Sequence, residues 1–334
     1  MKWYNIYKFL FAAIFLSFSF FGEVDGQPIP GQDENIPYLV TFGKNGDKSW
    51  GDDDFSQSFF LAIPPDFKDR FYIRVFDPDT GGELDELKGA ADTKMLYAVY
   101  GGKGVDPEKR ENLDSRGIQP TGSYKSGTLL ASKIFSNEKL YDNKFYTFGP
   151  FIATQGELNE KWNKYMFKII CDGISGDDGN LYRYFISRDP NKDVPIEGAN
   201  AFTYEYTFRM WNDIKSVSHI YPYIDTGIVY VQQSNFDWDD DGEIMVVSRV
   251  RKGVTVPISQ QTNWEISKIA VEPGEVGSSL DFQFHKKQDY LIRNNNVVIS
   301  LENQRGDNLK FFAAPIGGVP IYEPKVLVRK VPKK

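Results

Sequence analysis

The sequence predicts an all-β protein made of two tandem antiparallel β-sandwich domains. Apolar residues recur at every second position far more often than at helical spacing, and short apolar segments alternate with Gly, Pro, Asp and Asn. Aromatic residues make up 15% of the 334 residues, and the 41% hydrophobic and 25% charged residues are ordinary for a globular protein. At about 100 to 200 residues per domain, the length accommodates two domains.

The N-terminus, residues 1–26, is typical of a secretory signal peptide. Lys2 and Lys8 precede the uncharged run 9–21, and small residues of a cleavage site end at Gly26. The run has 13 residues, which is too short to span a hydrocarbon core of about 30 Å. We expect cleavage there and export to the periplasm, the cell surface or the medium, with no transmembrane segment left in the mature chain. An uncleaved anchor or a buried N-terminal strand is the alternative.

The next residues, 27–37, are predicted to be a short extended lead-in outside the core, because prolines bracket a polar stretch. The first domain, 38–190, then shows short segments that are rich in aromatic and β-branched residues and bounded by turn formers. Its predicted strands are 38–42, 58–63, 71–76, 95–100, 128–135, 146–153, 165–171 and 181–186.

Turn formers without an apolar period mark a domain boundary at 189–198. The second domain, 199–334, resumes the strand pattern, and only 83–90 and 157–163 are short helical candidates. A single elongated barrel, or a jelly roll with a long insertion, is the alternative architecture. The predicted strands of the second domain are 202–208, 219–223, 228–232, 244–248, 254–258, 264–271, 280–284, 297–301, 310–314 and 326–331.

The strongest site signal is an acidic loop with carboxylates at Asp237, Asp239 and Asp241. A glycine follows, and Glu243 stands where such loops supply a main-chain carbonyl. Alternate residues of a tight loop point at one centre, which suits a hard cation such as Ca²⁺. The pattern resembles the DxDxDG loops of EF-hands, dockerins and thrombospondin type 3 repeats. It departs from the EF-hand at Ser248, where a bidentate Glu is expected, so the last ligand must come from elsewhere in the fold.

Two further acidic loops are less specific candidates for calcium. Alternating carboxylates beside glycines can wrap an ion, but the same residues are ordinary in hairpin turns. A solvated turn is therefore the alternative in each case, as it is for the first loop. The carboxylates concerned are Asp77, Asp79, Asp85 and Glu86 in one loop and Asp177 and Asp178 in the other.

The segment 71–81 (FYIRVFDPDTG), together with 165–170 and 180–187, resembles bacterial pre-peptidase C-terminal domains and related exported β-sandwiches. This resemblance implies a D-P-D turn close to bound calcium. It also implies a module that assists the secretion or the substrate attachment of a neighbouring enzyme. The second domain, 199–334, resembles no family that we can name.

The remaining sequence disfavours several functions. A net charge of −7 without a basic patch makes nucleic acid an improbable partner. The chain lacks the short motifs of serine hydrolases, zinc proteases, P-loop proteins and dinucleotide-binding enzymes. Its single cysteine, Cys171, lies in an apolar strand pattern, where a buried thiol is expected.

We therefore expect an exported, non-enzymatic, calcium-stabilised binding or structural protein that presents loops or sheet faces to a protein or glycan partner. A secreted carboxylate-dependent hydrolase of polysaccharide or peptide is the alternative, because paired acids leave no linear signature. Aromatic side chains could form a stacking platform for sugars, although core packing is the commoner role. The candidates are Trp211, Trp264, Tyr204, Tyr206, Tyr221, Tyr223 and Tyr230.

Overall fold

The computed structural model describes residues 28–105, 124–238, 242–287 and 294–324. It confirms the all-β prediction, with 46% of residues in strands and 4% in helical turns. The helical candidates 83–90 and 157–163 are wrong: the first is a loop, and the second begins as a strand and continues as a turn. Within the described residues, none of the helical segments is long and apolar enough to cross a membrane.

The strands of the first half are β1 (Pro28–Ile29), β2 (Leu39–Phe42), β3 (Ser56–Ile63), β4 (Arg70–Phe76), β5 (Lys94–Gly101), β6 (Thr128–Phe135), β7 (Phe145–Ile152), β8 (Glu157–Asn159), β9 (Lys164–Ser175) and β10 (Gly179–Ser187). Those of the second half are β11 (Asn200–Thr203), β12 (Glu205–Arg209), β13 (Ser218–Ile220), β14 (Tyr230–Phe236), β15 (Gly242–Val247), β16 (Val254–Val256), β17 (Trp264–Ala270), β18 (Asp281–Lys286), β19 (Asn296–Asn303) and β20 (Phe311–Phe312). The 3₁₀ turns are η1 (Gln32–Glu34), η2 (Lys48–Trp50), η3 (Ala153–Gln155) and η4 (Pro273–Glu275).

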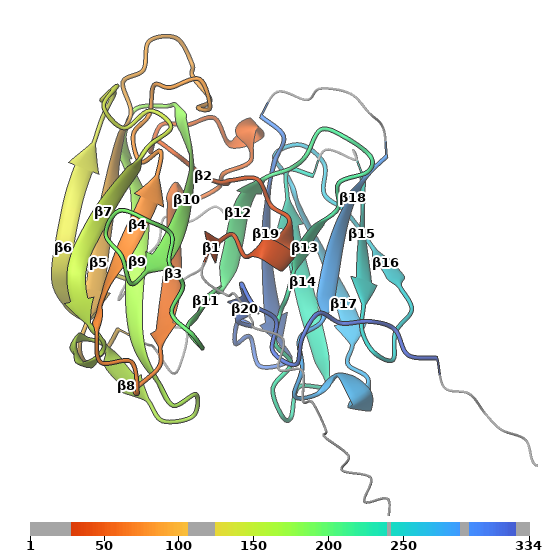
Figure 1. Cartoon of the computed structure of the whole chain (residues 1–334). Coiled ribbons are helices and arrows are strands. Elements are labelled where there is room, and N and C mark those ends of the chain that lie inside the picture. The colour runs from red at the N-terminus through yellow and green to blue at the C-terminus, as the bar shows by residue number, and fades with distance from the viewer. Residues whose placement is uncertain (1–27, 106–123, 239–241, 288–293, 325–334) are drawn as a thin grey trace, which may run out of the picture.

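These strands form three sheets (Figure 1). A nine-stranded sheet has the order β17-β14-β19-β12-β2-β10-β4-β7, and β1 also pairs with β10. A seven-stranded sheet has the order β20-β11-β3-β9-β5-β6, and β8 pairs with β9. The remaining four-stranded sheet has the order β13-β18-β15-β16.

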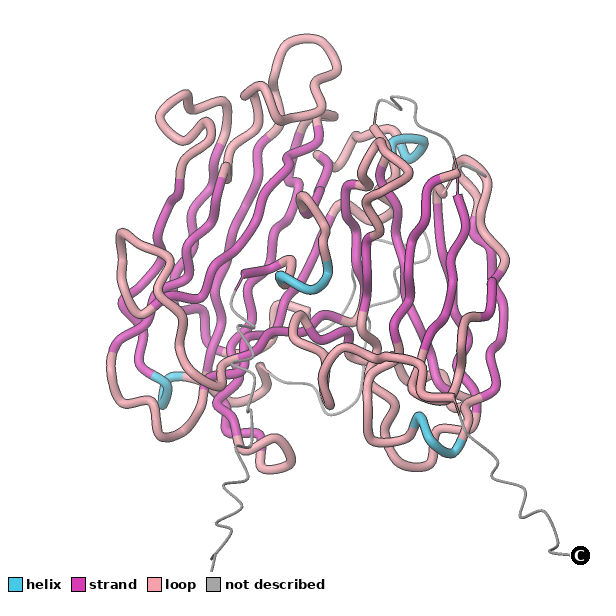
Figure 2. Tube along the Cα trace, turned by 45° about the vertical axis from the view of Figure 1, so that its right-hand side comes forward, coloured by secondary structure: helices cyan, strands magenta, loops and turns pink. Residues whose placement is uncertain are grey.

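The two halves of the chain share strands. In the nine-stranded sheet β2 lies between β10 and β12, with Leu39 opposite Phe208, and in the seven-stranded sheet β11 pairs with β3. The predicted strand 202–208 is interrupted at Tyr204, where the chain passes from one sheet to the other. The molecule has two lobes, one built mainly from the first half of the chain and the other mainly from the second half (Figures 1 and 2). The lobes stand side by side and are joined by hydrogen-bonded strands of the shared sheets.

The core is continuous between the lobes. The ring of Phe59 on β3 contacts the ring of Tyr184 on β10, with the ring centroids 5.9 Å apart. It also contacts the ring of Tyr206 on β12, at a centroid distance of 5.5 Å. Further along, Phe208 contacts Phe284 on β18 at 5.3 Å. The long sheet thus packs on the seven-stranded sheet in one lobe and on the four-stranded sheet in the other. Burial of each such ring contributes about 1.5 to 3 kcal/mol.

The lead-in belongs to the core, contrary to the expectation from its composition. Ile29 is fully buried on β1, and the Glu34 side chain on η1 is buried as well. The Glu34 Oε2 atom accepts hydrogen bonds from Gly31 N at 2.5 Å and from the Tyr206 hydroxyl at 2.7 Å. Burial raises the pKa of Glu34 to about 8 despite these two donors.

The outer face of the seven-stranded sheet is also apolar. Alternate residues of a strand point to opposite faces, so Phe60 on β3 lies on the face opposite to Phe59. There its ring stacks on the ring of Phe202 of β11, with the ring centroids 5.0 Å apart. Trp162 and Tyr223 are half-buried at the edge of this second cluster. This aromatic edge borders the pocket described below.

Candidate functional site

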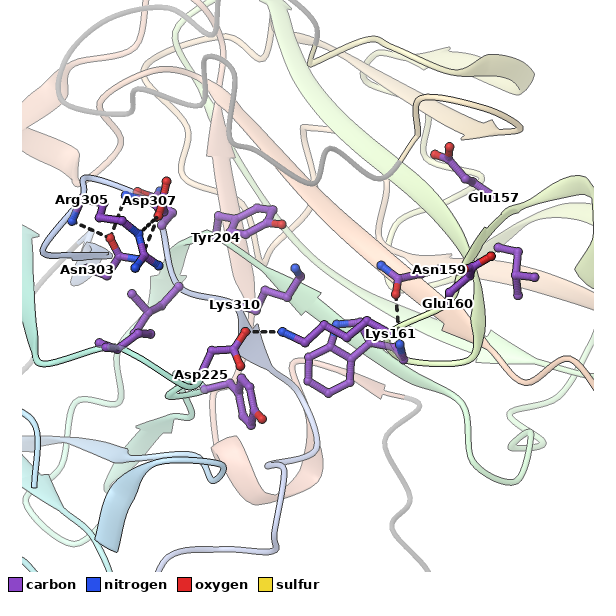
Figure 3. Close-up of a pocket in the computed structure, with 16 residues that line it drawn as sticks. Glu157, Asn159, Glu160, Lys161, Tyr204, Asp225, Asn303, Arg305, Asp307 and Lys310 are labelled. Carbon is purple, nitrogen blue, oxygen red and sulfur yellow. Dashed lines mark hydrogen bonds and ion pairs between the residues drawn. The ribbon is translucent and has the colours of Figure 1, made fainter. Parts of the chain in front are cut away.

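A pocket of about 610 Å³ lies where the two halves of the chain meet. The first half contributes the turn 157–162 at the β8–β9 hairpin, and the second half contributes Tyr204, 223–228 and 303–310. Figure 3 shows these segments approaching the same space from opposite sides. Such concave sites between structural units are the usual places for ligands.

One part of the pocket wall is aromatic. The Trp162 ring contacts the Tyr223 ring at 5.2 Å with an interplanar angle of 73°. Behind them, Trp162 also contacts Phe312 at 5.2 Å, which supports the indole from the core side. Aromatic rings that are half-exposed and held in place by packing offer a flat apolar surface at low entropic cost.

The rest of the wall carries charges of both signs (Figure 3). Lys161 and Asp225 form an ion pair between the two halves, and the Arg305 guanidinium bonds to Asp307 at 3.0 Å. Burial opposes ionisation of Asp225, but the hydrogen bonds from Lys161 and from Thr226 N, together with the positive charges of Lys161 and Lys310, outweigh it and lower the Asp225 pKa. A catalytic acid requires a raised pKa, so Asp225 has the properties of a hydrogen-bond acceptor rather than of a proton donor.

Sequence reasoning anticipated part of this aromatic wall. Tyr204 and Tyr223 line the pocket, whereas Tyr206 and Tyr221 are fully buried core residues. Trp162 was not predicted, because it follows three polar residues in a segment that was interpreted as a short helix. A tryptophan within a polar turn is the signal that could have identified it.

The predicted calcium loop is described only at its two ends. Asp239 and Asp241 lie outside the described residues. Asp237 is buried and its Oδ1 atom accepts a hydrogen bond from Thr262 N at 2.8 Å. Glu243 lies on strand β15 opposite His285 and is half-buried. Calcium binding at this loop stays a prediction.

The glycine of that loop has a packing role of its own. A Cβ atom added at Gly242 would lie 2.2 Å from the indole of Trp238 and 2.1 Å from the carbonyl oxygen of His285. Trp238 is buried and contacts the Phe284 ring at 5.7 Å. Close packing therefore requires a glycine at this position whether or not an ion binds.

In the second predicted loop, Asp85 and Glu86 have structural partners. Asp85 accepts hydrogen bonds from the backbone N–H groups of Gly81, Gly82 and Leu181 at 2.8 to 3.1 Å. Burial raises the pKa of Asp85 to about 8. Glu86 forms an ion pair with Arg209 of β12. Two of the four candidate calcium ligands in this loop, Asp85 and Glu86, therefore already have partners within the protein.

The other two carboxylates of this loop, Asp77 and Asp79, are buried and face Asp142, a residue that the sequence reasoning did not select. Asp142 belongs to the turn between β6 and β7. The sequence gives no local reason to associate that turn with the D-P-D segment. Only the pairing of β4 with β7 brings them together.

In the third predicted loop, Asp178 is buried and its carboxylate is fully engaged. Its oxygens accept hydrogen bonds from the backbone N–H groups of Lys88, Asp92 and Thr93 and from the Thr93 hydroxyl, at 2.9 to 3.2 Å. Asp177 and Asp92 have ligand oxygens within 4.8 Å of Asp178. The Asp178 carboxylate ties the 88–93 loop to β10, which accounts for its burial without an ion.

A compact acidic cluster also lies in 52–54, where oxygens of three buried carboxylates are within 4.8 Å of one another. Asp52 accepts hydrogen bonds from Phe42 N at 2.7 Å and from Phe55 N at 3.2 Å. Burial raises the pKa of Asp52 to about 6, and burial together with the neighbouring carboxylates raises that of Asp54. The cluster has the oxygen-rich chemistry that a hard cation prefers.

Comparison with known proteins assigns no family to this chain. No model of a known protein family matches the chain, and no curated protein matches it at a significant level. The functional argument therefore rests on the residues themselves.

Proposed function

We propose that this protein is an exported, non-enzymatic glycan-binding protein that holds a neutral oligosaccharide in the pocket between its two halves. The observation that carries the proposal is the combination of the Trp162–Tyr223 aromatic wall with surrounding hydrogen-bonding side chains in one cavity of about 610 Å³. An aromatic face packs on the apolar face of a sugar ring, while charged and amide groups bond to its hydroxyls.

The charges of the pocket favour a neutral ligand. Acceptors and donors are interspersed, and each ion pair, such as Lys161–Asp225, cancels most of its own field. A polyanion would meet the carboxylates of Asp225 and Asp307, and a polycation would meet Lys161 and Arg305. Sugar hydroxyls both donate and accept hydrogen bonds, so they can bond to either sign.

The decisive experiment is calorimetric titration of the purified chain with neutral oligosaccharides such as cellohexaose, xylohexaose and mannohexaose. Replacement of Trp162 by alanine is expected to weaken the binding of the preferred sugar by tenfold or more, since stacking on the indole is lost. Trp264→Ala is the matched control, because Trp264 is a half-buried tryptophan of β17 outside the pocket. The control variant should bind as the parent protein does.

Two results would contradict the proposal. Equal loss of affinity in both tryptophan variants would show a general stability effect, and absence of binding to neutral sugars of every linkage tested would remove the ligand class. Release of reducing ends during incubation would instead support the carboxylate-dependent hydrolase.

Export and calcium stabilisation are parts of the same proposal. The signal-like segment 1–26 supports export, and the spacing of Asp237, Asp239 and Asp241 supports an ion that rigidifies the second half. A pocket assembled from two lobes benefits from stiff loops, because the entropy of ordering them is then lost on folding rather than on binding. Detection of the mature chain outside the cytoplasm, beginning after Gly26, would test the export step.

A further inference from the structure

A second and smaller pocket lies on the outer face of the seven-stranded sheet. Its volume is about 180 Å³, and its wall is almost entirely apolar. The indole of Trp162 lines this pocket as well as the larger one. The apolar side chains of the wall come from β3, β9, β11, β20 and two turns, and they are Ala62, Met166, Phe202, Phe312, Trp162 and Ile316.

The floor of this small pocket is preformed. Ala62, Met166, Phe202 and Phe312 are at most 5% exposed. The ring of Phe312 contacts the ring of Phe202 at a centroid distance of 5.4 Å and that of Trp162 at 5.2 Å. A rigid apolar cavity of about 150 Å³ is large enough to bind benzene, so this pocket can hold one aromatic ring.

One end of the small pocket is polar. Lys164 Nζ donates to Gly198 O at 2.9 Å, and both residues line the pocket. Gly198 is exposed and Lys164 is half-buried, so the pocket opens to solvent there. The other polar side chain, Asn200, is engaged with the backbone, since it donates to Ala314 O and accepts from Ala201 N. An ammonium group has three donors, so Lys164 is the group that can bond to a ligand.

The positive charge of Lys164 is weakly balanced by its surroundings. Burial lowers the pKa of Lys164, and the negative charge of Asp66 opposes this shift. Among the described residues, none of the ion pairs includes Lys164. A carboxylate placed in the pocket would therefore gain a charge-assisted hydrogen bond from this ammonium group.

We propose that the small pocket binds a free aromatic monocarboxylate, with its ring against Phe202, Phe312 and Trp162 and its carboxylate on Lys164 Nζ. Aromatic rings favour offset and edge-to-face contacts with other rings, and three of them line this pocket. The proposal goes beyond sugar binding and does not depend on it, because Lys164 and Ala62 do not line the larger pocket.

The test is titration of the purified chain with benzoate and with its uncharged counterpart benzamide, followed by ligand-observed NMR. A ligand of this size that fills the pocket should bind with a Kd of about 1 mM. Benzamide should bind about tenfold more weakly, because only the carboxylate places a negative charge against the ammonium group.

Two variants separate the charge from the cavity. Lys164→Met keeps an apolar stem and removes the charge, so it should weaken benzoate about tenfold and leave benzamide unchanged. Lys192→Met is the matched control, because Lys192 is exposed and outside the pocket, and it should keep the preference for benzoate.

Ala62→Leu should abolish the binding of both probes, since the larger side chain occupies the space that the ring would take. Filling an existing cavity is compatible with the fold, and thermal unfolding of this variant checks that it is folded. The lysine variants carry the charge test independently of this check.

Three results would each overturn the proposal. One is an absence of benzoate binding by the parent chain, and another is equal affinity of the parent chain for benzoate and benzamide. The third is parental affinity for benzoate in a folded Ala62→Leu variant, which would place the acid elsewhere on the protein.

Discussion

At the residue scale, function and stability depend on where individual carboxylates find their partners. Asp85 accepts from backbone N–H groups of its own loop and of β10, and Asp178 accepts from backbone N–H groups of the 88–93 loop, which explains the burial of both carboxylates. Asp77 and Asp79 have such donors for only one oxygen each. Aspartates at similar turn positions therefore differ in their hydrogen bonding, because the surrounding segments determine how many donors reach each carboxylate oxygen.

Glu34 gives a prediction about pH at this scale. Its folded pKa of about 8 lies above the usual value of 4.5. The contribution of this group to stability is therefore complete below pH 4.5 and is lost as the pH rises through 8. We expect Glu34→Gln to be more stable than the parent chain at pH 9, by about 5 kcal/mol, and similar to it at pH 4.5.

Urea unfolding at the two pH values checks this expectation. The exposed Glu197→Gln serves as the control and should follow the parent chain. A difference between Glu34→Gln and the parent that does not grow with pH would contradict the assignment of a buried, proton-binding carboxyl at Glu34.

At the scale of elements, the loop after β4 is held by one ion pair to the second half of the chain. Glu86 is buried beneath Arg209 of β12, and Asn296 of β19 donates to Glu86 Oε1 at 3.0 Å. Burial lowers the pKa of Arg209 to about 10, but the guanidinium remains charged at neutral pH. Removal of Glu86 would therefore leave a largely buried cation.

We expect Glu86→Gln to reduce the free energy of unfolding by about 3 kcal/mol, since breaking a buried pair leaves one charge uncompensated. The double variant Glu86→Gln/Arg209→Met should recover part of that loss. Chemical denaturation of the single and double variants measures both effects. A neutral result for Glu86→Gln would show that the pair does not anchor the loop.

At the scale of the whole molecule, the shared sheets couple the two lobes. A fragment that ends near residue 198 would expose β2 and β3, which pair with β12 and β11 in the full chain. We therefore expect one cooperative unfolding transition, coincident by tryptophan fluorescence and far-UV circular dichroism. Two separated transitions, or a stably folded fragment 27–198, would show that the lobes are independent domains.

The architecture also explains why the pocket belongs to the whole molecule. Its aromatic wall combines Trp162 of the first half with Tyr223 of the second, and the ion pair Lys161–Asp225 joins the same two segments. Because the lobes are expected to unfold together, binding of the proposed ligand should be lost in the same transition as the fold.

By itself, the sequence determined the all-β class, most strand positions and the acidic loops, because period-two patterns and turn residues are local signals. It could not reveal that 202–208 divides between two sheets, that Asp142 faces Asp77, or that Trp162 meets Tyr223. Those relations depend on strand pairing between residues far apart in the chain, and no local pattern encodes which edges meet. The tertiary structure alone decided which acidic side chains have donors and which are buried without them.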